Sequence, residues 1–133
     1  MRLTMNIPDR WAIISAELAT ADSYENQKRT EYLRAALEQD GHHAMPVLGC
    51  YEGVKEHSFF VPDIYAWKAE GYGARFEQKA VLTHQGLTIL GSNRHPPLPI
   101  EKVILSPFRP KGDWTLLQSC GLYLKVIFEG EAP

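Results

Sequence analysis

The chain of 133 residues carries a formal net charge of −2 at pH 7, with 44% hydrophobic and 23% charged residues, a composition typical of one ordinary globular domain. The near-neutral charge and the scattered basic residues argue against a dedicated nucleic-acid binder, because neutralising phosphates needs concentrated Lys and Arg. No apolar run approaches the ~20 residues of a membrane-spanning helix, and the N-terminus lacks the apolar core of a secretory signal, so we expect a cytoplasmic protein.

The start of the chain predicts a strand followed by a capped helix. Residues 11–18 are typical of a strand, with two consecutive isoleucines among polar flanks. A helix is expected to begin at Asp22 or Ser23, whose short polar side chains suit a helix N-terminus, and to end at Gly41. Asn26 stands at the head of the apolar stripe of this helix. We therefore expect its side chain to point toward the end of the preceding strand.

Two strand pairs separated by a second helix are expected in the middle of the chain. Residues 44–51 and 56–61 predict a hairpin, because two strand-like runs flank a turn that contains glycine. Residues 64–76 predict a helix, although two glycines weaken its second half. Residues 79–84 and 87–90 predict another pair of strands across a short turn.

The last third of the chain has a different character. Three prolines make residues 91–99 a loop, and residues 107–113 form a second one. Residues 101–106 predict a strand, and residues 121–128 have the strongest strand pattern of the chain.

Together these elements predict a single small α+β domain that spans residues 1–133. We expect a mixed, mostly antiparallel sheet with two helices packed on it, in the order β-α-β-β-α-β-β followed by C-terminal strands. Residues 91–133 form a C-terminal extension in this interpretation, with Pro-rich loops and a final strand.

Four short motifs occur in a defined order in the first two thirds of the chain. They are Ser23-x-Glu25-Asn26-x-x-Arg29, Gly41, Gly49-x-Tyr51-x-Gly53-x-x-Glu56-x-Ser58-Phe59-x-Val61 and Phe76-x-Gln78-x-Ala80-Val81-Leu82. This combination resembles a family of small phage and bacterial proteins catalogued as a domain of unknown function, over about residues 12–90. The resemblance implies an α/β domain and frequent phage origin, with no established chemistry. The family usually has glycine immediately before the last Gln, where this chain has Glu77.

Polar residues of these motifs form the first candidate site, a ligand-binding group of Asn26, Arg29, Glu56, Ser58 and Gln78. Helical and strand periodicity allow these side chains to face one space, where an Arg fork can hold a phosphate or carboxylate and amides can hold a base edge. The alternative is a buried structural network, in which Arg29 pairs with Glu56 and Asn26 satisfies loop backbone.

The late loops form the second candidate site, for a protein partner. Arg94, His95, Phe108, Arg109 and Trp114 combine cations and aromatic rings with stiff prolines, a pattern that suits binding anchors. The alternative is that these are ordinary connecting loops, with Phe108 and Trp114 folded back into the core.

The sequence contains little that indicates an enzyme. The five histidines and two cysteines show no metal-ligand spacing, so we expect no metal and no cofactor. No nucleophile motif or phosphate-cradling glycine loop occurs. Glu17 and Glu56 are an acid–base pair only if the fold brings them together.

The function that we expect from the sequence is binding. The chain is interpreted as a non-enzymatic, phage-type accessory protein, such as a host-defence inhibitor that engages a host protein or sequesters a small anionic, nucleotide-like ligand. If phage-encoded, it would act in the host cytoplasm, and a homo-oligomer is compatible with this interpretation. The alternative is a small enzyme for a nucleotide-like substrate, with a Glu base and with Arg29 as phosphate clamp.

Overall fold

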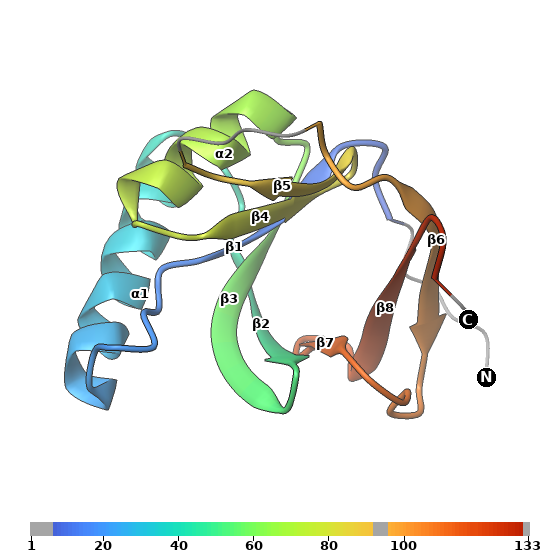
Figure 1. Ribbon diagram of the computed structural model, residues 1–133. Helices are drawn as coiled ribbons and strands as arrows, with labels where there is room; N and C mark the ends of the chain where they lie inside the picture. Colours follow the sequence, from blue (N-terminus) through green and yellow to red (C-terminus); the bar gives the residue numbers. More distant parts are fainter. Residues whose placement is uncertain (1–6, 92–95, 132–133) are drawn as a thin grey trace.

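The computed structural model describes residues 7–91 and 96–131, and within these ranges the chain forms two helices and eight strands (Figure 1). In chain order they are β1 (Trp11–Ser15), α1 (Ser23–Gln39), β2 (Met45–Tyr51), β3 (Val54–Pro62), α2 (Ala66–Arg75), β4 (Ala80–Thr83), β5 (Gly86–Ile89), β6 (Ile100–Ser106), β7 (Trp114–Leu117) and β8 (Leu122–Phe128). The prediction of a small α+β domain with two helices is confirmed.

The strands form one sheet in the order β5-β4-β1-β3-β2-β7-β8-β6. All neighbouring strands in the described ranges pair antiparallel, so the parallel pairs of the mixed sheet that we predicted are not found there. The reason lies in the two helical crossovers. Each crossover joins two strands that run in the same direction, but an antiparallel strand lies between them: β3 separates β1 from β2, and β1 separates β3 from β4.

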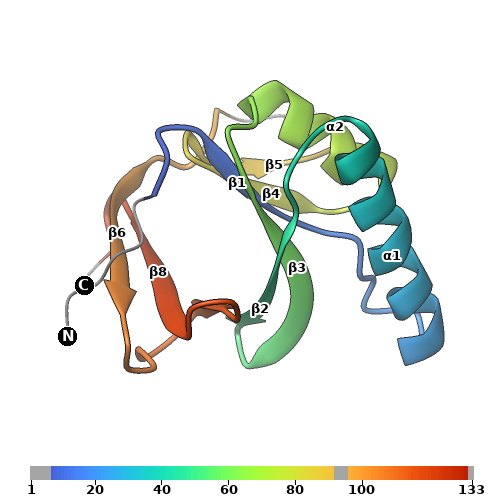
Figure 2. The same ribbon diagram turned by 180° about the vertical axis from the view of Figure 1, so that it is seen from behind.

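The sheet is curled so strongly that it approaches a barrel (Figures 1 and 2). Both helices lie outside one half of it, and β6, β7 and β8 form the opposite wall. Leu87 in β5 and Leu98, just before β6, exchange backbone hydrogen bonds of 3.0 and 2.9 Å. This bridge connects the two ends of the strand order. The strands β6, β7 and β8 of the last third of the chain are therefore part of the same sheet and do not form a separate extension.

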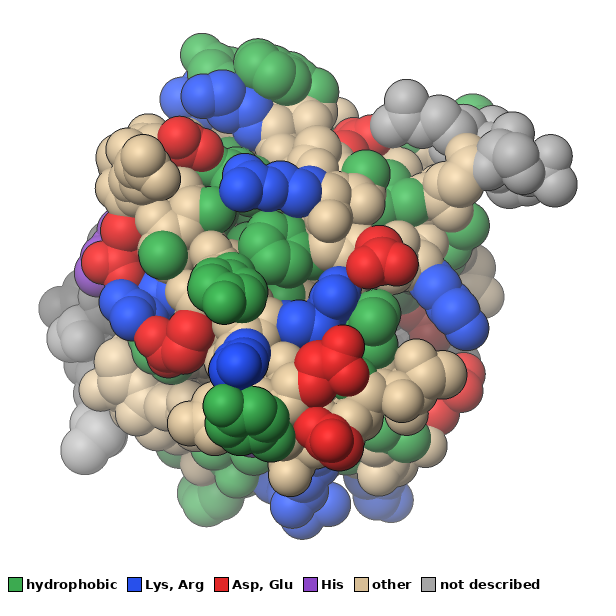
Figure 3. Space-filling model, turned by 90° about the vertical axis from the view of Figure 1, so that its left-hand side faces the viewer, with side chains coloured by type: hydrophobic (Ala, Val, Ile, Leu, Met, Phe, Trp, Pro, Cys, Tyr) green, Lys and Arg blue, Asp and Glu red, His purple; other side chains and the backbone are tan. Residues whose placement is uncertain are grey.

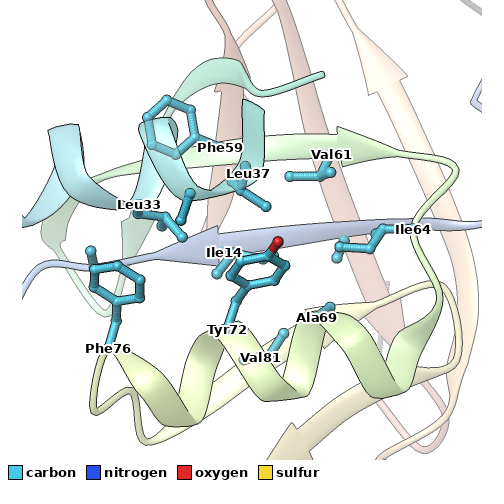
Figure 4. Packing of buried hydrophobic residues seen from close by; sticks show 13 residues of the cluster. Ile14, Leu33, Leu37, Phe59, Val61, Ile64, Ala69, Tyr72, Phe76 and Val81 are labelled. Carbon is cyan, nitrogen blue, oxygen red and sulfur yellow. The ribbon is translucent and has the colours of Figure 1, made fainter. Parts of the chain in front are cut away.

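Alternating side chains of the central strand divide the hydrophobic core into two clusters. Ala12 and Ile14 of β1 face the helices and pack with Leu33 and Leu37 of α1 (Figure 4). Trp11 and Ile13 face the inside of the curled sheet, in a cluster with Phe60, Val47, Leu117, Leu122 and Leu124. Successive side chains of a strand point to opposite faces, so β1 is buried on both sides.

Glycine permits the close contact between α2 and the sheet. A Cβ atom at Gly73 would lie 2.2 Å from Cγ2 of Val81 and 2.8 Å from Cδ1 of Leu90. No side chain fits at that distance. In contrast, a Cβ atom at Gly71 would meet nothing within 4 Å. The glycine that lowers the helix propensity of this segment is thus required by its packing.

The helix N-terminus and C-terminus follow the sequence signals at α1. Asp22 is the N-cap, with Oδ1 accepting a hydrogen bond of 2.8 Å from the backbone N–H of Glu25. Gly41 follows the helix with a φ of 85°, and the N–H of His42 then returns to the carbonyl of Leu37 at 2.9 Å. A positive φ at this point is what favours glycine.

Candidate functional site

The inner side of the curled sheet forms a partly open cavity of about 610 Å³. Its walls come from β1, β3 and β4 on one side and from β7 and β8 on the other. This volume lies in the range of about 300–1,000 Å³ that is usual for small-molecule sites. The cavity is therefore the principal candidate site of the described residues.

One part of the cavity is apolar. It is formed by aliphatic and aromatic side chains of five strands, namely Ile13, Leu82, Leu87, Trp114, Leu124, Val126 and Phe128. On β1 and β4 the lining residues Ile13 and Leu82 alternate with Ile14 and Val81, which belong to the cluster that faces the helices. Such a surface suits the hydrocarbon part of a ligand.

The other part of the cavity is polar and lies around the end of β1. Ser15, Glu17, Glu56 and Ser58 line it, and Glu56 and Ser58 share one face of β3 as strand periodicity predicts. Ser15 Oγ donates to the carbonyl of His57 at 3.0 Å and accepts from the N–H of Glu17 at 3.1 Å. These bonds hold the polar wall in a defined position.

The carboxyl group of Glu56 is partly desolvated inside the cavity. This burial raises the pKa of Glu56, and the nearby charge of Glu17 raises it further. The neighbouring hydroxyl groups of Ser15 and Ser58 lower the same pKa and offset part of the effect. The fold thus brings together the two carboxylates that the sequence had left as a conditional acid–base pair.

Glu17 is held by the neighbouring strand through a hydrogen bond. Its Oε1 accepts a bond of 2.9 Å from the backbone N–H of His57, and its Oε2 lies 3.5 Å from Nδ1 of the His57 ring. The ring is largely exposed, so it lies at the outer side of the carboxylate. Glu17 is therefore fixed in place before any ligand arrives.

Tyr51 adds a hydroxyl group between β2 and β7. Its phenol oxygen lies 2.8 Å from Oγ1 of Thr115, and burial raises the pKa of Tyr51. Gly49 makes room for the ring, because a Cβ atom there would lie 2.5 Å from Cε2 of Tyr51. The Gly49-x-Tyr51 motif thus serves to place this aromatic ring beside the cavity.

Gln78 lines the cavity and connects its wall to the segment that leads into β4. Its Nε2 donates to the carbonyl of Glu17 at 3.1 Å and to that of Phe76 at 3.2 Å. Gln78 therefore positions the backbone that carries Glu17.

Asn26 points toward the end of β1, as the sequence predicted, but its amide is used by the backbone. Oδ1 accepts from the N–H of Leu18 at 2.8 Å, and Nδ2 donates to the carbonyl of Leu18 at 3.0 Å. The residue is not among those that line the cavity. This is the backbone-satisfying role of the network alternative.

Arg29 lies behind the same wall, with its side chain 17% exposed. Nε donates to the carbonyl of Ala16 at 2.6 Å and Nη2 to that of Phe76 at 2.5 Å. Nη1 lies 3.4 Å from Oε1 of Glu77, so the carboxylate partner is Glu77 and not Glu56. The five residues of the first candidate site are thereby divided: three line the cavity and two brace its wall.

Glu77 has a backbone conformation that favours glycine. Its φ is 61°, in the left-handed region, and the resemblance described above led us to expect glycine at this position. The backbone turn is therefore kept in this chain without the residue that adopts it most easily.

The late-loop residues that the structure describes differ in exposure. Phe108 is 79% exposed, whereas Trp114 is 5% exposed and lies in β7, where it packs edge-on against Tyr123. The guanidinium of Arg109 lies 5.2 Å from the centre of the Trp114 ring. Folding back into the core is thus found for Trp114 but not for Phe108. Arg94 and His95 lie outside the described residues.

Sequence reasoning missed the far wall of the cavity. β7 was not predicted, so nothing in the sequence indicated that Thr115 lines a site. Lys125 was recognised only as part of a segment with a strong strand pattern. Tyr51 and Glu56 stand in adjacent strands of a predicted hairpin, and that alternation was the available signal. Which face of each strand meets the cavity depends on the curl of the whole sheet.

Neither a metal site nor a membrane-spanning helix is found in the part of the chain that the structure describes. There, no group of three or more His, Cys, Asp or Glu side chains is arranged to hold a metal ion. Neither α1 nor α2 combines the length and apolarity needed to cross a membrane. Over the helices, charges of both signs are mixed with separate hydrophobic side chains (Figure 3).

Comparison with known proteins gives one result for the segment that contains most of the polar wall. No curated protein matches the chain. Residues 18–81 match the model of the family described as "Protein of unknown function (DUF3293)", which confirms the resemblance to a domain of unknown function.

Proposed function

We propose that this protein acts by binding a small organic molecule inside the curled sheet. The observation that carries the proposal is the cavity of about 610 Å³, which combines apolar walls with a cluster of polar groups at one end. Ligand sites are typically built in this way, with apolar surface for affinity and a few polar groups for orientation.

The polar groups are positioned in advance by the fold. Ser15, Glu17 and Gln78 are held by hydrogen bonds to backbone, and Tyr51 is held by Thr115. A site in which side chains are already ordered loses less conformational entropy on binding. This arrangement supports a binding role more directly than it supports a purely structural core.

An accessory role of phage type remains part of the proposal. Sequestering a small molecule is one way to inhibit a host defence, and this would take place in the cytoplasm of the host. Engagement of a host protein is the other form that we predicted. We assign no phosphate-clamp role to Arg29, because its guanidinium group is used by two carbonyl oxygens and by Glu77.

Ligand-observed NMR with a fragment library tests the proposal on the full chain. We expect several fragments to bind to the natural chain. Their binding should be lost in an Ala80→Trp variant, because Ala80 lines the cavity and the indole ring would fill it. Ala74→Trp is the matched control, since Ala74 is exposed on α2 and is not a lining residue. Circular dichroism verifies that both variants fold. Binding that is absent from the natural chain, or equal in both variants, would contradict the proposal.

A second candidate function is acid–base catalysis. The raised pKa of Glu56 beside Glu17 favours it, because two carboxyl groups in different environments are a common arrangement for a general acid and a general base. Mass spectrometry of the fragment hits after incubation tests this alternative. Chemical conversion by the natural chain but not by Glu56→Gln would support catalysis, and unchanged hits would leave binding as the function.

A further inference from the structure

Oxygen atoms dominate the polar end of the cavity. Ser15, Glu17, Glu56, Ser58 and Tyr51 present hydroxyl and carboxylate groups there. These groups accept hydrogen bonds, and the carboxylates only accept when ionised. The ligand group that they match is therefore one with several N–H or O–H donors.

The charges of the cavity lining also favour a ligand group that donates hydrogen bonds. Five of the described lining side chains are carboxylates, namely Glu17, Glu56, Glu77, Asp113 and Glu131, against the ammonium groups of Lys79 and Lys125. Lys125 Nζ is already bound to the carbonyls of Lys111 and Asp113, at 2.7 and 3.3 Å. Lys79 is exposed to solvent, as are Glu77, Asp113 and Glu131, so the half-buried carboxylates of the lining are Glu17 and Glu56. An anionic ligand would meet net repulsion in this lining.

Glu56 lines the cavity and has no cationic partner among the residues that the structure describes. The ion pairs among the described residues do not include it, and the only such pair of the neighbouring Glu17 is with the ring of His57. A desolvated carboxylate that lacks a cation costs free energy in its charged form. A cation that enters the cavity would restore the missing interaction.

We propose that the ligand is an organic amine, with a protonated amino group between Glu56 and Glu17 and an apolar body against Leu82, Leu124 and Val126. This inference rests on the proposed binding function and names the chemical class of its ligand. The N–H groups would donate to the carboxylates and to the hydroxyls of Ser15 and Ser58. An organic amine fits the lining better than a small inorganic cation, because only the amine has an apolar body to contact the apolar walls.

Isothermal titration calorimetry with three matched probes tests the class of ligand. Phenylbutylamine, phenylbutanol and phenylbutyrate share one apolar body and differ in the charge of the polar end. Near neutral pH we expect the amine to bind at least about tenfold more tightly than the alcohol, since a charge-assisted hydrogen bond is roughly twice as strong as a neutral one. The carboxylate is expected to bind most weakly.

Two variants assign this preference to the cavity. Glu56→Gln should weaken the affinity for the amine by about tenfold or more and leave the affinity for the alcohol unchanged, because only the amine interacts with the negative charge of Glu56. Glu101→Gln removes the same charge from an exposed position on β6 and should leave both affinities unchanged. If Glu56→Gln does not fold, Ser58→Ala gives a second variant on the same wall.

Proton release gives a signature that general charge attraction would not produce. At a pH low enough to protonate part of Glu56 before binding, the amine must displace that proton. The natural chain is titrated in two buffers with different ionisation enthalpies. The observed binding enthalpy of the amine should then differ between the buffers, and that of the alcohol should be the same in both. Glu56→Gln should abolish the difference.

The outcomes separate this inference from the proposed function. An amine preference that depends on Glu56 supports both. Equal or tighter binding of the alcohol or the carboxylate overturns the amine inference and leaves small-molecule binding intact. Absence of binding for all three probes also overturns it, and a fragment screen without hits in the same natural chain then overturns the proposed function as well.

Discussion

Arg29 and Gln78 donate hydrogen bonds to the same backbone oxygen, that of Phe76. Arg29 also reaches the carbonyl of Ala16, and Gln78 that of Glu17. The two side chains lie on opposite sides of the wall. Arg29 reaches it from α1, and Gln78, in the segment after α2, lies on the cavity side. They fasten the end of β1 to the segment after α2, and so they hold Glu17 in place.

Replacement of Arg29 tests this bracing role. Arg29→Met should lower the free energy of unfolding by about 2–4 kcal/mol, because two carbonyl oxygens lose charged hydrogen-bond donors in a partly buried place. Arg34→Met is the matched control. Arg34 pairs with Glu31 and Glu38 on the exposed face of α1, where such pairs contribute little. Urea denaturation measures both, and equal effects of the two changes would refute the bracing role.

The two glycines of α2 should respond in opposite ways to alanine. Gly73→Ala is expected to lower the free energy of unfolding by about 1–3 kcal/mol, since the new methyl group collides with Val81 and Leu90. Gly71→Ala enters open space and should raise the same quantity by up to about 1 kcal/mol through better helix propensity. Thermal and urea unfolding of the pair provides the measurement. A loss of stability at both positions would show that the close packing is not the cause.

Glu77 is the position where a change to glycine should be tolerated. Glu77→Gly relieves the left-handed φ of 61° and should leave the free energy of unfolding unchanged or raise it by up to about 1 kcal/mol. Gln27→Gly, at an exposed position inside α1, should instead lower it by about 1 kcal/mol. Chemical denaturation of both variants decides the matter. Equal losses would mean that the backbone at Glu77 carries no strain.

Glu56 should make stability depend on pH. Its pKa is raised in the folded chain, mainly by burial, so the folded state binds its proton more tightly than the unfolded state does. The stabilisation that this tighter proton binding gives is fully present below the unfolded pKa and is lost as the pH rises through the folded pKa. Glu56→Gln should therefore stabilise the fold relative to the natural chain at neutral pH, and this advantage should shrink as the solution becomes acidic. Urea midpoints over a pH series measure it, and a difference independent of pH would count against the raised pKa.

Local signals in the sequence predicted the elements whose causes are local. The cap at Asp22, the glycine after α1 and the hairpin of β2 and β3 depend on neighbouring residues, and each lies where the pattern indicated. β7 was missed because four residues between two irregular segments show too little periodicity. Its place in the sheet comes from pairing with β2, more than 60 residues earlier.

The candidate site shows the same division. Alternation on β3 predicted that Glu56 and Ser58 share a face, and helical spacing predicted where Asn26 points. The sequence could not reveal that backbone groups use the polar atoms of Asn26 and Arg29, because that depends on where the chain turns after β1. It also could not show the cavity, which exists only when β8 curls toward β1 and β4.

The central place of β1 has a consequence for how the chain is made. Ile13 pairs with Phe60 on one side and with Leu82 on the other, about 50 and about 70 residues later. At about 5–20 residues per second, ribosomes add the second partner about 3–14 seconds after β1. A strand with apolar side chains on both faces must wait that long for its neighbours. During synthesis, chaperone capture and aggregation of β1 therefore compete with its folding.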